Sequence, residues 1–193
     1  MKKDIKNQII EATIALIEES GSNTDSVTIQ NICKRVGIGS GLVNYHFQTK
    51  ENLIAQCVQK IIGEVIGKHG AISQSLKEMT PEQKLRFMAK STFSYLMSHK
   101  NISRISILTD LEGDNLKDNT SQTVSAYFPL IRDVCPEIMS DREVTEKTYL
   151  LTLMLQAAFL RADLLKEEIG VDFRDEQQRD QLIDRAIDIC VFK

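Results

Sequence analysis

The sequence is poor in aromatic residues and in the residues that interrupt regular structure. Of its 193 residues, 3 are prolines and 9 are glycines; aromatic residues make up only 6%, and tryptophan is absent. Hydrophobic residues make up 42% and charged residues 26%, a balance typical of globular proteins and not of disordered ones. The many Leu, Ile, Lys, Glu and Gln residues favour helix. Since no alternating strand pattern, repeat or low-complexity segment is present, we expect an all-α fold.

Signals for export, disulfides and membrane insertion are also missing. The first residues, MKKDIKNQII, lack the long apolar core and the cleavage site of a secretory signal. The longest apolar run, residues 149–160, is too short to span a bilayer and is interrupted by Thr152 and Gln156. The four cysteines, Cys33, Cys57, Cys135 and Cys190, are far apart in the sequence and form no CxxC motif, so they suggest neither a zinc ribbon nor a disulfide framework. These absences predict a cytoplasmic protein with no membrane partner.

Motifs for catalysis and metal binding are scarce. The sequence has no Gly-rich phosphate loop, GxSxG elbow or HExxH motif, and the pair Glu167-Glu168 has the character of solvent-facing helix charge. His69 and His99 have no histidine or carboxylate at the i+3 or i+4 position that a metal site on a helix needs. We therefore expect no enzyme activity, no metal and no cofactor. A redox-sensing thiol is the alternative to a packing role for the cysteines.

Charge is distributed unevenly along the chain. Residues 1–60 hold seven Lys and Arg against six Asp and Glu, whereas residues 61–193 hold 17 against 21. This difference permits an amino-terminal part that faces nucleic acid, but the excess is too small to argue for one unaided.

Apolar residues recur at helical spacing along the chain. In the amino-terminal part they predict a first helix from Ile5 that stops at Gly21, followed by a polar turn at 22–26. Thr28 then caps a two-turn helix that ends before Gly37. Further helices are expected at 40–47, from Lys50, and at 81–98, 101–112, 115–134, about 141–169 and about 175–191. Capping boxes mark the starts of two of them, at Thr80 with Gln83 and at Ser140 with Glu143.

Residues 28–47 fit a helix-turn-helix. Gly37 can take the positive φ of the turn, and Cys33 is small where the helices cross. The apolar positions where the two helices must pack on each other are Ile32, Val36, Ile38 and Val43. Because two such short helices cannot stabilise each other alone, the first helix and the start of the fourth must complete a three-helix core.

The stretch VTIQNICKRVGIGSGLVNYHFQTKENL, residues 27–53, resembles the amino-terminal domain of TetR-family transcriptional regulators. That signature runs through a turn glycine, a recognition helix and an aromatic-His-Phe end followed by Lys-Glu. The resemblance covers residues 5–60 closely, and the remaining helical layout is similar without distinctive motifs. Asn44 stands where tyrosine is common, and Leu42 stands where a small or hydroxyl residue is common. The resemblance implies a helix-turn-helix DNA-binding domain at 1–50 and a helical ligand-binding and dimerisation domain at 51–193.

In such a head, Tyr45 and His46 lie at the end of the recognition helix that meets the sugar-phosphate backbone. Lys50 and Thr28, each at the start of a helix, extend the phosphate contact. The residues left to face base edges are Ser40, Gly41, Leu42 and Asn44. Two alternatives remain open from the sequence: Tyr45 and His46 filling space between helices, and Lys34 with Arg35 forming either a DNA contact or a solvated face.

The segment from Tyr149 to Leu165 is apolar on nearly all sides, so it must be buried on two sides. Pairing it and the last helix with their symmetry mates would make the homodimer that the resembled family forms; the alternative is a central helix of a monomer. The resemblance also implies a cavity for a small-molecule effector. Its candidate lining residues, each of which could equally be ordinary core, are Phe93, Tyr95, Met97, Tyr127, Gln156 and Phe159.

These observations together predict a transcriptional repressor that binds a palindromic DNA operator as a dimer and is released by a small molecule. The alternative is a helical ligand-binding or adaptor protein with a degenerate, nonbinding head, because the head is nearly neutral and Asn44 departs from the family pattern. An enzyme on a helical scaffold is a third hypothesis, which the missing catalytic motifs weigh against.

Overall fold

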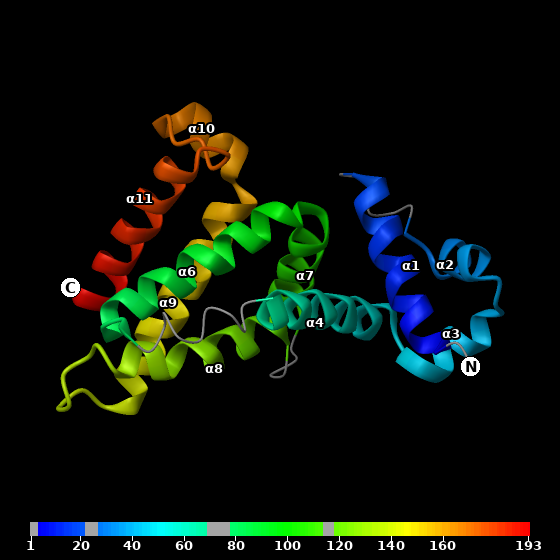
Figure 1. Ribbon diagram of the computed structural model, residues 1–193, viewed down its shortest axis with the longest axis horizontal. Coiled ribbons are helices and arrows are strands. Elements are labelled where there is room, and N and C mark those ends of the chain that lie inside the picture. Colours follow the sequence, from blue (N-terminus) through cyan, green and yellow to red (C-terminus); the bar gives the residue numbers. More distant parts are fainter. Residues whose placement is uncertain (1–3, 22–26, 69–77, 114–117) are drawn as a thin grey trace. The chain divides into compact units, whose positions relative to one another are not determined.

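The computed structural model of the chain describes residues 4–21, 27–68, 78–113 and 118–193, and their side chains apart from those of 61–68. Every element in these ranges is helical, as expected for an all-α protein (Figure 1). The polar turn expected at 22–26, His69 and the first residues of the helix expected at 115–134 lie outside the described residues. The chain forms two compact units, Met1–Gly70 with His99–Asn115, and Ala71–Ser98 with Leu116–Lys193. The functional boundary expected at residue 50 stays a prediction.

The first unit contains α1 (Ile5–Ser20), α2 (Ile29–Val36), α3 (Ser40–Phe47), α4 (Lys50–Lys68) and α7 (Lys100–Glu112). α1 packs against α2, α3, α4 and α7. As Figure 1 shows, α1 lies beside α2 and α3, and it supplies the third helix that this short pair needs. Ile9, Ile17, Ile32 and Leu53 are fully buried between these helices. The expectation of a three-helix core completed by the fourth helix is confirmed.

Two cysteines belong to this core. Cys33 and Cys57 are both buried, and Cys57 Sγ lies 3.7 Å from the carbonyl oxygen of Ile10. Burial raises the pKa of the Cys57 thiol to about 12, which keeps it protonated at neutral pH. Since the thiolate is the reactive form, Cys57 acts as a packing group. The packing interpretation of Cys33 is confirmed by its burial.

The second unit is built from α6 (Pro81–Ser98), α8 (Asn119–Arg132), α9 (Asp141–Leu160), α10 (Ala162–Ile169) and α11 (Glu176–Ile187), with a π-helical turn at Asp188–Phe192. α8 packs along α9, and α6 packs against α8, α9 and α11. Both expected capping boxes form, since Ser140 exchanges hydrogen bonds with Glu143 and Thr80 does so with Gln83. Within the described residues, no helix taken singly is long and apolar enough to span a membrane, although the bent pair of α9 and α10 passes that test jointly.

The long helix expected to run to about Ile169 is a wrong prediction. α9 ends at Leu160, and the chain turns by 83° into α10 through Arg161, whose φ of −107° and ψ of 16° are not helical. The turn brings Phe173, which lies beyond α10, next to Phe93 on α6, with 5.2 Å between the centres of the two rings. The apolar pattern runs through the break without change, because both α9 and α10 bury residues beside it. The extent of the last helix, expected at about 175–191, is confirmed: its α-helical part ends at Ile187, and a π-helical turn continues it to Phe192.

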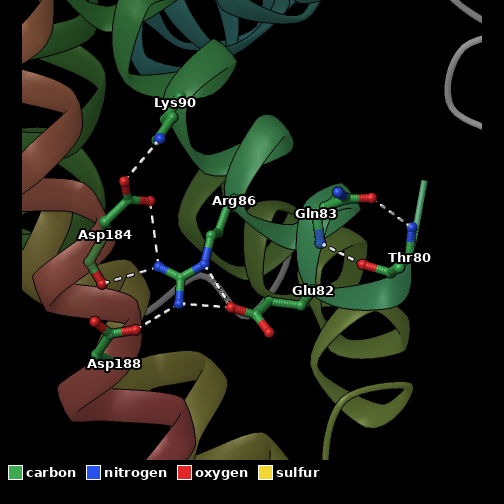
Figure 2. A network of polar contacts seen from close by, with 7 residues as sticks. All are labelled: Thr80, Glu82, Gln83, Arg86, Lys90, Asp184 and Asp188. Carbon is green, nitrogen blue, oxygen red and sulfur yellow. Dashed lines mark hydrogen bonds and ion pairs between the residues drawn. The ribbon is translucent and has the colours of Figure 1, made fainter.

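A cluster of ion pairs fastens α6 to α11 and to the turn that follows it (Figure 2). Arg86 contacts the carboxylates of Glu82, Asp184 and Asp188, and Lys90 Nζ lies 2.8 Å from Asp184 Oδ2. The Arg86 guanidinium also lies 5.7 Å from the centre of the Phe192 ring. Because one half-buried cation joins three carboxylates, this cluster holds the carboxy-terminal turn in place on its own unit.

Candidate nucleic-acid interface

The turn between α2 and α3 has the geometry that the sequence predicts. Thr28 Oγ1 accepts a hydrogen bond of 3.1 Å from the Asn31 N–H, which caps α2. α2 ends at Val36 and is capped by Gly37, whose φ of +77° places it in the left-handed region and whose N–H donates to the Cys33 carbonyl at 2.8 Å. A residue with a Cβ would be strained at this φ, so glycine at this position determines how α3 leaves α2.

α3 has one buried face and one open face. Val43 and Phe47, four residues apart, are 1% and 2% exposed and anchor the helix to its unit. The remaining face is open along the helix and carries Ser40, Gly41, Leu42, Asn44 and Tyr45. The core role expected for Phe47 is confirmed.

Tyr45 and His46 close the exposed end of α3. Tyr45 is 80% exposed, so it does not fill space between helices, and that alternative is excluded for this residue. The half-buried His46 ring lies edge-on to Tyr45, with 5.1 Å between ring centres, and 6.1 Å from the Phe47 ring. His46 therefore lies between the buried Phe47 ring and the Tyr45 ring, which projects into solvent.

α4 begins immediately beyond this end of α3. Gln48 takes a positive φ of 64°, and Thr49 then caps α4 by accepting a 3.1 Å hydrogen bond from the Asn52 N–H. Thr49 leaves the N–H groups of Lys50 and Glu51 at the helix start, where the positive end of the helix dipole favours an anion. The sequence reasoning placed Lys50 here but missed Thr49, although a threonine directly before a helix start is a recognisable cap.

Two cations of the head are already neutralised. Arg35 donates to both carboxylate oxygens of Glu19, and Lys60 Nζ lies 2.8 Å from Asn7 Oδ1 and 2.9 Å from Glu11 Oε1. The hydrogen bonds from Arg35 hold the pKa of Glu19 below its ordinary value. Of the two interpretations of Arg35, the structure favours a solvated face, because its guanidinium is turned toward α1.

The candidate ligand residues all lie in the second unit and are partly brought together. Phe93 and Phe159 meet edge-on with 6.3 Å between ring centres, and Phe173, which the sequence reasoning missed, joins them through Phe93. The Tyr127 hydroxyl lies 3.1 Å from the Met88 carbonyl oxygen and 2.8 Å from Thr92 Oγ1. The half-buried members of the set are Tyr95 and Met97.

Gln156 is buried one turn before Phe159 on α9. Its Nε2 donates a 2.9 Å hydrogen bond to Thr120 Oγ1, while its buried Oε1 accepts none from the described part of the chain. An unsatisfied buried acceptor is costly, so Gln156 Oε1 is a position that a hydrogen-bond donor would satisfy.

The fold of the first unit defines a helix-turn-helix protein, and comparison with known proteins names the family that this domain matches. Residues 9–57 match the family model described as bacterial regulatory proteins, tetR family. Within these residues the chain therefore carries a DNA-binding domain of the tetR-family type. The match covers the helix-turn-helix itself, from α1 into α4.

Curated relatives share the same amino-terminal region. The HTH-type transcriptional regulator BetI of Yersinia pestis (strain Pestoides F) is 31% identical over 91 residues, which are 46% of this chain and 43% of that protein. YerO, an uncharacterised HTH-type transcriptional regulator of Bacillus subtilis (strain 168), is 26% identical over 123 residues, 64% of this chain and 40% of that protein. The chain thus spans less than half the length of the curated relatives it matches.

Solved structures extend the likeness in fold to nearly the whole chain. A chain from a study of the molecular basis for control of antibiotic production by bacterial hormones superposes with a TM-score of 0.59 at 16% identity, over 96% of this chain and 98% of that one. A TetR-family transcriptional regulator from Mesorhizobium loti MAFF303099 does so with a TM-score of 0.51 at 16% identity, over 96% of both chains. At this identity the likeness shows a common fold and nothing about ligands.

Proposed function

We propose that the protein is a cytoplasmic, DNA-binding transcriptional repressor that binds a palindromic operator as a homodimer. The observation that carries the proposal is the open face of α3. A large aromatic ring, Tyr45, is 80% exposed there beside a half-buried histidine, on a helix whose opposite face is fixed in the core. Exposed polar and aromatic groups on a rigid helix are suited to recognition of a surface.

Phosphate contacts are assigned to the two ends of this face. The Tyr45 hydroxyl and a His46 ring N–H can donate to phosphate oxygens at the end of α3, and Lys50 can do so at the start of α4. The Thr28 hydroxyl accepts the capping hydrogen bond from Asn31 and retains its own hydrogen for a phosphate. These contacts position the head without reading sequence.

Base contacts are assigned to the middle of the exposed face. Asn44 can pair bidentately with adenine in the major groove, and Leu42 can contact a thymine methyl group. Ser40 offers a small hydroxyl. Gly41 has open space around the position of a Cβ, which allows close approach of the helix backbone to the groove.

Dimerisation is assigned to α9 and the carboxy-terminal turn. Four large apolar side chains of α9 and two of the turn are exposed in the single chain: Tyr149, Leu150, Leu153, Met154, Ile189 and Phe192. Exposed apolar residues at i, i+1, i+4 and i+5 form one stripe along α9, and such a stripe is costly in water. A second copy that covers it by a two-fold axis would place two heads on successive major grooves.

Release from the operator is assigned to a small molecule bound in the second unit, among Phe93, Tyr95, Met97, Tyr127, Gln156 and Phe159. The aromatic groups supply an apolar wall, and Gln156 Oε1 supplies an acceptor that lacks a donor in the described residues. The effector class that fits is an apolar molecule with at least one hydrogen-bond donor. Its differential affinity for the free and operator-bound forms would weaken DNA binding.

The proposal is tested by selecting bound duplexes from a random pool and sequencing the enriched set. The expected result is one palindromic sequence with half-sites about one helical turn apart. Enrichment of no sequence, with salt-independent or absent binding, would overturn the proposal and favour a helical ligand-binding protein with a nonbinding head.

A further inference from the structure

The structure separates the cations of the head into two groups. In the described part of residues 1–60, Arg35 and Lys60 have carboxylate partners within 3 Å, at Glu19 and Glu11. Lys6 forms no ion pair within the same ranges, and its side chain is exposed. Only cations in this second group keep their full charge available to an external anion.

Lys6 also lies beside the phosphate-facing end of α3. Its Nζ is 5.9 Å from the centre of the Phe47 ring, and Phe47 is the residue that follows His46 and ends α3. Lys6 comes from the first turn of α1, so a helix outside the helix-turn-helix reaches this end. The contact with the ring orients the ammonium group but leaves its positive charge uncompensated.

We propose that Lys6 is a further phosphate-contacting residue, which donates from α1 to the operator backbone next to the phosphate held by Tyr45 and His46. The inference rests on the proposed DNA-binding function. It adds a residue to the interface that the helix-turn-helix does not contain. The Lys6 ammonium group, held against the Phe47 ring, acts as a point charge toward phosphate. It therefore adds affinity for DNA but no preference among base pairs.

Paired and unpaired lysines provide a matched comparison. Lys6→Gln and Lys60→Gln remove the same charge from the same head, but Lys60 is already bound to Asn7 and Glu11. Loss of a phosphate contact flattens the plot of log K against log salt by about 0.9 per contact, or about 1.8 in a symmetric dimer. Lys6→Gln should show this change, Lys60→Gln should not, and Lys6→Arg should restore the slope. The order of preference among duplexes should be the same for all.

The position of the contact is tested by replacing single phosphates of the selected operator with neutral methylphosphonates. At one phosphate per half-site, this replacement should weaken binding by the wild-type protein but not by Lys6→Gln. The protein substitution and the phosphate replacement form a double-mutant cycle, which reports whether the two groups interact directly. Thermal melts of each variant establish that the head is folded. An unchanged slope for Lys6→Gln, or an equal flattening by Lys60→Gln, would overturn the assignment. If the wild-type protein bound no duplex, the proposed function itself would be overturned. Wild type and Lys6→Gln would then show the same absence of DNA binding.

Discussion

Arg35 on α2 donates to Oε2 of Glu19 on α1 at 2.6 Å and to Oε1 at 2.7 Å, in the paired arrangement that guanidinium and carboxylate groups favour. The pair ties the helix-turn-helix to the helix that completes its core. It also gives the Arg35 guanidinium a carboxylate partner within its own unit. Both roles depend on ionisation of Glu19.

We expect the stabilisation from this pair to be lost in acid. The pKa of Glu19 is lowered from its ordinary value of 4.5 by hydrogen bonding to Arg35. Its contribution is therefore present above pH 4.5 and disappears as the pH falls through the lowered folded-state pKa. Thermal melts of wild type and Glu19→Gln should differ at pH 7 and converge as the pH falls below 4.5. A difference that stays constant down to pH 2 would show that ionisation of Glu19 contributes nothing.

Lys50 and Asn44 should affect DNA binding in different ways. Lys50→Ala should weaken binding to all duplexes about equally and reduce the salt slope by roughly one unit per head. Asn44→Ala should cost on the order of 1–3 kcal/mol per half-site on the preferred operator and relax discrimination at one base pair. Affinities measured across a salt series for the operator and singly substituted duplexes distinguish the two. Equal loss on every duplex for Asn44→Ala would contradict its assignment to a base edge.

Gly37 and Gly41 should respond oppositely to the same substitution. Gly37→Ala places a Cβ at φ +77° and should lower the free energy of unfolding by roughly 1–2 kcal/mol. Gly41→Ala meets no atom within 4 Å and should leave stability unchanged or raise it by up to about 1 kcal/mol. We nevertheless expect Gly41→Ala to weaken operator binding, because its methyl group occupies the face that approaches the groove. Denaturant melts and binding titrations on both variants check this, and undiminished operator binding by Gly41→Ala would move the interface away from that face.

Charging the α9 stripe should dissociate the dimer. Leu150 is 59% exposed in the single chain and Leu153 is 40% exposed. Burial of the exposed part of each leucine contributes roughly 1 kcal/mol, and a two-fold interface buries both leucines of both copies, so Leu150→Glu with Leu153→Glu should weaken association by at least about 100-fold. Ile138→Glu is the matched control, since Ile138 is 96% exposed and lies before α9. Sedimentation velocity should show a monomer for the double variant and a dimer for the control. A double variant that remains a dimer would place the interface elsewhere.

Tyr127 should make the second unit sensitive to alkali. Burial raises its pKa to about 12, against 10 for an exposed tyrosine. Between pH 10 and 12 the unfolded chain releases this proton and the folded protein retains it, so stability falls as the pH rises. Tyr127→Phe should be less stable at pH 7 by roughly 1–2 kcal/mol, through its lost hydrogen bonds, yet lose less stability from pH 10 to 12. Denaturant melts across this range test both, and parallel pH profiles would contradict the effect.

Local structure in both units follows from the sequence alone. Thr28 as a cap, Gly37 with a positive φ, α3 at Ser40–Phe47 and the capping box at Ser140 each depend on groups within about four residues of one another. Side-chain caps and left-handed glycines act at that range, so a reader of the sequence can recognise them. The open face of α3 was predictable for the same reason, because Val43 and Phe47 define its buried side.

Features that depend on distant residues were decided only by the tertiary structure. The turn at Arg161 replaces a helix that local pattern favours, since it lets Phe173 pack on Phe93, 80 positions earlier in the chain. Arg35 and Lys6 carry the same positive charge at neutral pH, yet only packing of α1 brings one to a carboxylate and the other to the end of α3. Local spacing determines which residues form a helix. Contacts between helices determine which charged side chains remain available to a partner. The spacing of residues along the sequence does not predict these contacts.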